Sequence, residues 1–146
     1  MLELERRIEE RGAPAFPHDP SLTAMEWSPM PRDEHRISYA VLENGTEVAR
    51  ALVNVRPAPI GPNYQCPSPR DVDVQLEKIE VRIELTRNGQ HMGRRTVEAL
   101  RAAHPGRMYA FAAHDAPGFY RKLGWAEYEH VDGPSRGRSE LFVAEN

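Results

Sequence analysis

The sequence holds little that would point to a disulfide framework, a membrane span or a highly charged partner. Among its 146 residues there is one cysteine, Cys66, so no internal disulfide can form, which fits a reducing compartment. No apolar run approaches the roughly 20 residues needed to cross a bilayer, and the N-terminus is too charged for a signal peptide. The formal net charge of −3 gives no overall reason to bind nucleic acid. We therefore expect a cytoplasmic protein with no membrane or nucleic-acid partner.

Metal and covalent chemistry also lack support in the sequence. The six histidines form no i, i+4 pair and have no cysteine partner, so no metal site is predicted. No serine lies in a G-x-S-x-G elbow, and Cys66 lies in a proline-rich stretch, so a covalent enzyme intermediate is not expected. Hydrophobic residues make up 40% of the chain, enough for the core of a single domain over residues 1–146.

Residues 81–103 form the pattern around which the chain is organised. Val81, Ile83 and Leu85 share one parity, as in a strand, and a loop containing Gly89 leads into a helical pattern from Met92 onward. A strand, a glycine loop and a helix can hold a phosphate, because the free N–H groups and the positive end of the helix dipole point at it. The loop has neither the ending of a P-loop nor a G-x-G-x-x-G fingerprint. Taken alone, the pattern is better explained by an ordinary turn, because Asn-Gly turns and strand-loop-helix connections are common.

Two motifs resemble one enzyme family. The segment I-E-L-T-R-N-G-Q-H-M-G-R-R, residues 83–95, resembles the acyl-CoA-binding segment V-x-P-x-x-R/Q-G-x-G-x-G/A of the GCN5-related N-acetyltransferases (GNAT). Farther on, F-Y-R-K-L-G-W, residues 119–125, resembles the same family's F-Y-x-K-x-G-F. Both occur in the family's order and at its usual separation, so the resemblance covers about residues 72–146. Two residues depart from the pattern: Asn88 replaces the basic residue and His91 replaces the middle glycine.

The resemblance implies an α/β fold: a mixed, mostly antiparallel central sheet with helices on both faces. It implies a single acetyltransferase-like domain whose residues 1–34 are short and atypical and whose cofactor-binding half is about 72–146. Acetyl-CoA would be the cosubstrate, a primary amine would attack it directly, and a homodimer is an option. The cofactor would contact the backbone of two residues and the loop that follows: Ile83, Leu85, Asn88, Gly89, Gln90, His91, Met92, Gly93 and Arg94.

Acyl transfer to an amine needs a base for the amine and an acid for the departing thiolate. The resemblance implies Tyr120 as the acid, with packing beside Phe119 as the alternative. It implies a strand glutamate as the base, Glu77 before Glu80, whereas the alternative is a solvated charged face. A second function therefore stays open: a degenerate domain that binds acyl-CoA or a protein partner without catalysis.

Two positions in the loop allow opposite interpretations. His91 tolerates the left-handed backbone region better than most residues, and its ring would add either strain or a hydrogen bond to a pyrophosphate. Arg94 and Arg95 fall in the first helical turn, where cations are unfavourable unless a polyanion is bound. Solvation at the surface is the alternative for both arginines.

The first half of the chain is expected to contain one helix, a loop and a hairpin. Residues 2–11 are predicted to form a short helix, because Leu4 and Ile8 share a helical face. Residues 13–32 and 56–70 each hold five prolines and are expected to be irregular, the former with one turn near residues 22–27. Asn44-Gly45 between apolar-alternating runs predicts a hairpin of strands 36–42 and 46–55.

Residues 72–85 are predicted to form one strand whose apolar residues change parity along its length. Either a bulge or burial on both faces explains that change. Beyond the helix that ends at residues 104–106, we expect a strand at 108–112 and a helix at 116–123, capped by Asp115 and ended by Gly124. Two last strands, 125–131 and 140–144, are separated by a loop at 133–137.

Overall fold

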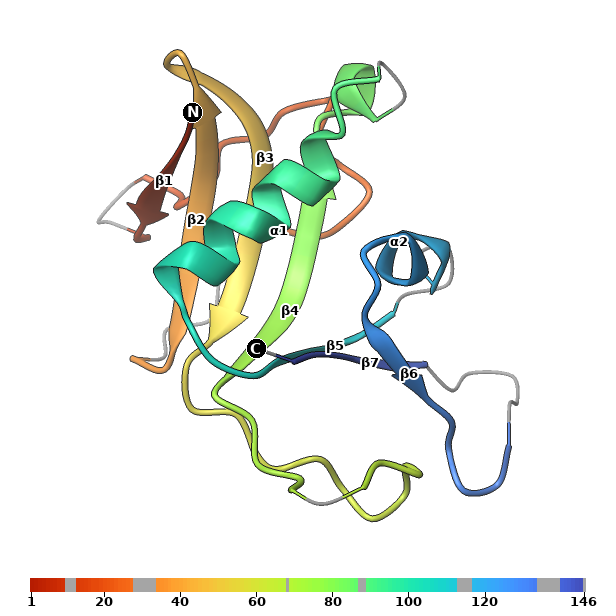
Figure 1. Cartoon of the computed structure of the whole chain (residues 1–146). Coiled ribbons are helices and arrows are strands. Elements are labelled where there is room, and N and C mark those ends of the chain that lie inside the picture. Colours follow the sequence, from red (N-terminus) through yellow and green to blue (C-terminus); the bar gives the residue numbers. More distant parts are fainter. Residues whose placement is uncertain are drawn as a thin grey trace. The chain divides into compact units, whose positions relative to one another are not determined.

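The fold is a seven-stranded mixed sheet with helices (Figure 1). The computed structural model describes residues 1–9, 13–27, 34–67, 69–86, 89–112, 117–133 and 140–145. The hydrogen-bonded strand order is β1-β2-β3-β4-β5-β7-β6. The pairs β1–β2, β2–β3, β5–β7 and β6–β7 are antiparallel and β4–β5 is parallel, which confirms the predicted mixed, mostly antiparallel sheet. The elements are β1 (Leu2–Arg7), β2 (Arg36–Glu43), β3 (Thr46–Asn54), β4 (Val74–Val81), the 3-10 helix η1 (Ile83–Leu85), α1 (Met92–Ala103), β5 (Met108–Phe111), α2 (Pro117–Lys122), β6 (Ala126–Tyr128) and β7 (Leu141–Ala144).

The chain divides into two compact units. The first consists of Met1–Asn54 and Glu77–His104, and the second of Val55–Leu76 and Pro105–Asn146. Strand β4 contributes its first three residues to the second unit and the rest to the first. The predicted change of parity falls at this boundary, between Leu76 and Ile79. The prediction of a single domain stays a prediction.

The hairpin of β2 and β3 confirms the Asn-Gly prediction. Asn44 has φ 53° and Gly45 has φ 81°, so both central residues of the turn adopt the left-handed conformation. Two such residues make the tight turn whose twist matches that of the flanking strands. The pairing shifts by one residue between Val41 and Leu42, a β-bulge inside the hairpin.

The predicted N-terminal helix is wrong, because residues 2–7 form strand β1. This strand pairs antiparallel with β2, from Leu2 opposite Glu43 to Arg7 opposite Ser38. Leu2 and Leu4 are half-buried while Glu3 and Glu5 are exposed, which is the alternation of a strand with one covered face. Pairing with a strand more than 30 residues away therefore overrides the local helical pattern.

Helix α1 and residues 13–27 cover opposite faces of the first unit's strands. Met92, at the start of α1, packs in one cluster with Val41, and partly buried Leu4 joins them. Residues 13–27 supply Ala15, Phe16 and Trp27 to another cluster, which contains Ala40. Ala40 and Val41 are successive residues of β2, so their side chains point to opposite faces. Figure 1 shows α1 lying across the strands of this unit.

The described part of residues 13–32 confirms the predicted loop. Residues 13–27 form no helix. The turn closed by the Leu22 N–H, which donates to the Asp19 backbone carbonyl at 3.0 Å, spans residues 19–22 and so lies earlier than the predicted turn at 22–27. Residues 28–33 lie outside the described part of the chain.

The predicted strand over residues 72–85 is correct in its centre and wrong at its end. Strand β4 stops at Val81, and Ile83–Leu85 form η1 instead. The Ile83 N–H donates to the Ser21 carbonyl at 3.0 Å, and the Leu85 N–H donates to the Arg82 carbonyl at 2.8 Å. The ladder thus ends because a residue about 60 positions earlier takes the Ile83 N–H. Ile83 itself is 65% exposed.

The second unit is built on β5 and β7. Val74 of β4 lies opposite Met108 of β5 in parallel, and all four residues of β7 are buried. Helix α2 follows, and Gly124 after it has φ 80°, as expected for the end of a helix. These elements confirm the predicted strands at 108–112 and 140–144 and a shorter form of the strand at 125–131. The predicted cap Asp115 and most of the 133–137 loop lie outside the described residues.

The core of the second unit gathers Ile60, Cys66, Tyr109, Leu141 and Val143. Residues 56–70 contribute two of these side chains without forming a helix or strand of their own where they are described, as predicted. Across the described ranges, no helix has both the length and the apolar character that a membrane crossing needs.

Candidate functional site

The loop before α1 presents an open helix N-terminus. Gly89 has φ 79°, and apart from its chain neighbours no atom of the described residues lies within 4 Å of the position that a Cβ would take there. His91 precedes the helix with φ 52° and ψ 44°, the left-handed conformation considered for it above. Its side chain makes no cap hydrogen bond, and Gly89, Gln90, His91 and Arg94 are exposed. The first N–H groups of a helix have no partner within the helix, so this end is open to an anion.

Two other predicted loop positions have different surroundings. Met92 is 2% exposed and packs with Val41, Val48 and Ala49, so its side chain belongs to the core. Gly93 is half-buried in the first turn of the helix. Asn88, the predicted replacement for the family's basic residue, lies outside the described residues.

The two arginines of the first turn differ. Arg95 forms an ion pair with Glu43 at the end of β2, and both side chains are partly buried. Its charge is therefore neutralised by the protein itself. Arg94 is exposed on the helix surface. The unfavourable placement of cations near a helix N-terminus is thus relieved for Arg95 without a bound polyanion.

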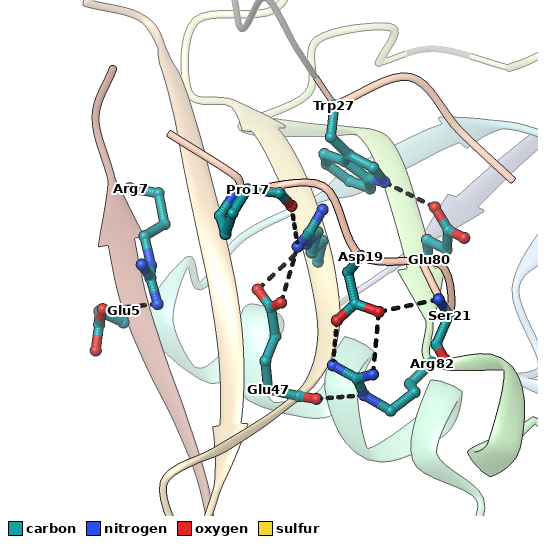
Figure 2. A network of polar contacts seen from close by, with 10 residues as sticks. Glu5, Arg7, Pro17, Asp19, Ser21, Trp27, Glu47, Glu80 and Arg82 are labelled. Atoms are coloured by element: carbon teal, nitrogen blue, oxygen red, sulfur yellow. Dashed lines mark hydrogen bonds and ion pairs between the residues drawn. The ribbon is translucent and has the colours of Figure 1, made fainter. Parts of the chain in front are cut away.

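Glu80 fastens residues 24–27 to the sheet. Its carboxylate accepts hydrogen bonds from the backbone N–H of Ala24 at 2.8 Å and of Met25 at 3.1 Å. The indole N–H of Trp27 donates to it at 2.7 Å (Figure 2). Three donors on one carboxylate give Glu80 a structural role that the sequence did not suggest.

Glu77, the other candidate base, pairs with Arg36. The Arg36 Nε lies 2.9 Å from one carboxylate oxygen and 3.1 Å from the other, and the Glu77 side chain is 18% exposed. This pairing leaves the carboxylate partly accessible. The two glutamates therefore differ: Glu80 is bound by three donors of the loop, and Glu77 by one side chain.

Tyr120 lies in the second unit, within an aromatic cluster. Its ring stacks on Phe142 with centroids 5.3 Å apart and contacts Trp125 at 5.1 Å and Phe119 at 5.1 Å. The residue is 4% exposed, and this burial raises the pKa of its hydroxyl. The packing alternative is therefore realised, while the predicted catalytic role stays a prediction.

A second set of polar contacts fastens residues 17–21 to the same sheet. Arg82 donates to the Asp19 carboxylate at 2.7 Å and to the Glu47 carbonyl at 2.8 Å (Figure 2). Hydrogen bonding from Arg82 holds the pKa of Asp19 below its usual value. Ser21 donates its hydroxyl to Glu84 of η1. Sequence reasoning missed this set because its partners are 35 to 63 residues apart.

Residues 14–27 and Arg50 line a cavity in the first unit that is open to solvent. Its volume is about 480 Å³, and its lining combines aromatic, aliphatic and charged side chains: Pro14, Phe16, Pro17, His18, Asp19, Leu22, Thr23, Met25, Glu26, Trp27 and Arg50. This size lies within the range of small-molecule sites in proteins. Within the described ranges, no group of three histidine, cysteine or carboxylate side chains could hold a metal ion.

Comparison with known proteins places this fold. No protein-family model and no curated protein matches the sequence. The chain is similar to an acetyltransferase from Thermus thermophilus, with a TM-score of 0.54 and 16% identity over 79% of this chain and 67% of that one. It is equally similar to the Bacillus subtilis N-acetyltransferase YlbP in complex with coenzyme A, with a TM-score of 0.54 and 16% identity over 75% of this chain and 67% of that one.

A third similar structure is the E. coli putative N-acetyltransferase YhhK bound to coenzyme A. Its TM-score is 0.51, with 16% identity over 84% of this chain and 82% of that one. At such identities the likeness is one of backbone arrangement. The resemblance found in the two sequence motifs is thus matched by the arrangement of strands and helices. The chain has the fold of the GCN5-related N-acetyltransferases.

Proposed function

We propose that this protein transfers an acetyl group from acetyl-CoA to a primary amine by direct attack. The observation that carries the proposal is the exposed glycine loop at the N-terminus of α1, in a chain with the acetyltransferase fold. The N–H groups of the first helical turn and the helix dipole suit the pyrophosphate of the cofactor. The loop from Asn88 to Arg94 would supply these contacts, with Met92 contributing only its backbone.

The backbone of Ile83 and Leu85 is the second part of the proposed cofactor site. Both N–H groups are hydrogen-bonded within the protein, that of Ile83 to the Ser21 carbonyl. In this proposal the pantetheine arm takes the Ile83 N–H by displacing the Ser21 carbonyl. The Ile83 N–H keeps one hydrogen bond in this exchange, and the carbonyl of half-buried Ser21 gives up its partner.

The proposed reaction needs two proton transfers. The amine nitrogen attacks the thioester carbonyl carbon, the C–S bond breaks, and the thiolate of coenzyme A leaves. We assign removal of the amine proton to Glu77, because three donors already occupy Glu80. We assign protonation of the thiolate to Tyr120, whose hydroxyl is protonated at neutral pH; the burial that raises its pKa makes it a weaker acid, so the donation has to be favoured by contacts made in the complex.

Calorimetric titration with acetyl-CoA tests the cofactor site. The unmodified protein is expected to bind, and Gly89→Glu is expected to bind about tenfold more weakly or not at all, because it places a carboxylate beside the phosphates. Gly45→Glu is the matched control: Gly45 also has a positive φ and open space around its Cβ position, but it lies in the β2–β3 turn. No binding by the unmodified protein, or equal losses in both variants, would overturn the proposal.

One observation favours a second function, acyl-CoA binding without turnover. Tyr120 is 4% exposed, and its ring is held between aromatic side chains. Release of free thiol from acetyl-CoA, measured with a panel of amines, separates the two functions. In the enzyme, Glu77→Gln and Tyr120→Phe slow thiol release without weakening acetyl-CoA binding. A protein that binds acetyl-CoA and releases no thiol with any amine is the binder.

A further inference from the structure

The cavity under residues 14–27 is formed entirely by the first unit, and the proposed cofactor contacts do not use it. Its walls come from the N-terminal segment, and Arg50 of β3 contributes to the floor. At about 480 Å³ it has room for a small organic molecule. The chemistry of its lining identifies the class of that molecule.

Two aromatic side chains give the cavity an apolar wall that is fixed in position. Phe16 and Trp27 meet edge to face, with centroids 5.2 Å apart and planes at 71°. Both are almost fully buried, and the indole N–H of Trp27 is bound by Glu80. The part of Trp27 left for a ligand is therefore its hydrocarbon surface. Leu22 and Met25 extend this apolar lining, which favours a compact hydrocarbon or aromatic body.

Two of the charged lining residues are neutralised by partners. Arg50 is 2% exposed and donates to the Glu47 carboxylate at 3.0 Å and to the Pro17 carbonyl at 3.0 Å. Asp19 is bound by Arg82 at 2.7 Å. Their charges are therefore satisfied inside the protein. A ligand gains little by pairing with either of them.

Glu26 is the remaining charged lining residue. It is exposed, and its carboxylate has no ion pair or hydrogen bond with the described residues. Lys78 donates to the Glu26 backbone carbonyl at 2.8 Å, and its ammonium lies 5.7 Å from the centre of the Trp27 ring. Among the carboxylates and arginines of the lining, the charge without a partner in the described residues is therefore that of Glu26. It suits a ligand with one positive charge.

We propose that this cavity binds primary monoamines with a compact aromatic or apolar body. The inference goes beyond the transferase function proposed above, because neither Glu77 nor the cofactor loop lines the cavity. The ammonium group pairs with Glu26, and the body of the ligand lies against Phe16 and Trp27. Polyamines gain nothing from their further charges, because the other lining carboxylate, Asp19, is already paired with Arg82.

Tryptophan fluorescence tests the cavity without acetyl-CoA. The chain has two tryptophans, so Trp125→Phe leaves Trp27 as the only reporter. We expect saturable quenching by 2-phenylethylamine, weaker binding of its neutral analogue 2-phenylethanol, and none by the anion 3-phenylpropanoate. Spermidine, which carries more charge and no ring, is expected to bind more weakly than 2-phenylethylamine. Calorimetry on the unmodified chain repeats the comparison in case Trp125→Phe disturbs the fold.

Glu26→Gln is the decisive variant. It is expected to weaken the binding of 2-phenylethylamine about threefold to fivefold, the loss of one exposed charge pair, and to leave the binding of 2-phenylethanol unchanged. Glu3→Gln, at an exposed glutamate of β1, is the matched control and is expected to leave both affinities unchanged. Equal binding of the amine by Glu26→Gln and the unmodified protein would overturn the proposal. So would binding of the anion as tight as that of the amine.

The failure of this inference and that of the transferase proposal are distinguishable. If 2-phenylethylamine binds as expected but acetyl-CoA does not bind, the cavity is an amine site and the transferase proposal is overturned. If acetyl-CoA binds and other amines are acetylated while 2-phenylethylamine does not bind, the transferase stands and the cavity proposal is overturned.

Discussion

At the scale of single residues, Arg50 shows how the first unit tolerates a charge in its interior. It lies in the middle of β3 and is among the largest fully buried side chains. A buried charge destabilises a protein unless it is paired and hydrogen-bonded. Glu47, three residues earlier, and the carbonyl of Pro17 satisfy the guanidinium, which also lies 4.8 Å from the centre of the Phe16 ring.

Removing Arg50 should therefore cost more than removing an arginine of a surface pair. Arg50→Met is expected to lower the free energy of unfolding by about 3 kcal/mol, because it leaves Glu47 without its partner. Arg50→Met combined with Glu47→Leu should recover part of the loss. Arg121→Met, which breaks the more exposed pair with Glu127, should cost less than about 1 kcal/mol. Urea denaturation measures all three, and equal losses for the two single variants would contradict this account.

At the scale of elements, β1 shows where a local pattern misleads. The segment L-E-L-E-R-R-I-E-E satisfies helical spacing at Leu4 and Ile8 and also alternates at Leu2 and Leu4. Propensity and spacing act within a few residues, but the choice is made by pairing with β2 and by packing against α1. The Asn44-Gly45 turn was predictable because both of its left-handed residues are local. The end of β4 was not predictable, because it depends on the hydrogen bond that the Ile83 N–H donates to the distant Ser21 carbonyl.

The same contrast applies to the candidate site. The glycine loop and the helix after it could be predicted, since positive φ at Gly89 and the periodicity of α1 are local properties. The three donors on Glu80 and the pairing of Asp19 with Arg82 could not be, since residues more than 50 apart form them. The cavity depends on those contacts, so nothing in the sequence alone indicated it.

Substitutions in β1 can distinguish the observed strand from the predicted helix. In a helix Leu4 and Ile8 would share a buried face, whereas in the strand Leu4 packs against the cluster around Met92 and Ile8 is 73% exposed. Leu4→Ser is expected to lower the free energy of unfolding by about 1–2 kcal/mol and Ile8→Ser by less than about 0.5 kcal/mol. Chemical denaturation gives both values. Similar losses at the two positions would favour the helix.

Acid should loosen residues 17–21 from the sheet. Hydrogen bonding from Arg82 depresses the pKa of Asp19 below its ordinary value of 3.8, so this contribution to stability is complete above that pH. It is lost as the pH falls below 3.8, because the folded state then has to bind the proton that Arg82 disfavours. Asp19→Asn should be less stable than the unmodified protein at about pH 6, and the difference should shrink toward about pH 3. Free energies of unfolding measured across this pH range test the prediction. A difference between the two proteins that does not change with pH would contradict the stabilising role of the Asp19–Arg82 pair.

At the scale of the whole molecule, the division into two compact units predicts uneven effects of core substitutions. Phe142 of β7 is fully buried and stacks on Tyr120 within the second unit. Local opening follows such units, because each is held mainly by its own contacts. A core substitution in one unit should therefore increase the rate of local opening in that unit more than in the other.

Phe142→Ala tests this directly. It is expected to lower the free energy of unfolding by about 3–5 kcal/mol. Amide hydrogen exchange should accelerate more in β5 and β7 than in β2 and β3, which belong to the first unit. Phe111→Ala, at a position 39% exposed in the same unit, should cost about 1–2 kcal/mol. Uniform acceleration across all four strands would show that the chain opens as one unit.

Residues 24–26 are bound to the sheet through their backbone groups, so their side chains can be substituted. Glu80 binds the backbone N–H groups of Ala24 and Met25, and Lys78 binds the backbone carbonyl of Glu26. Every residue except proline offers these same backbone groups. The side chains of Met25 and Glu26, which line the cavity, can therefore be exchanged while the segment stays in place. Single substitutions could therefore change which ligand binds while the backbone stays the same. A small library at positions 23, 25 and 26 would sample new ligands without redesigning the fold.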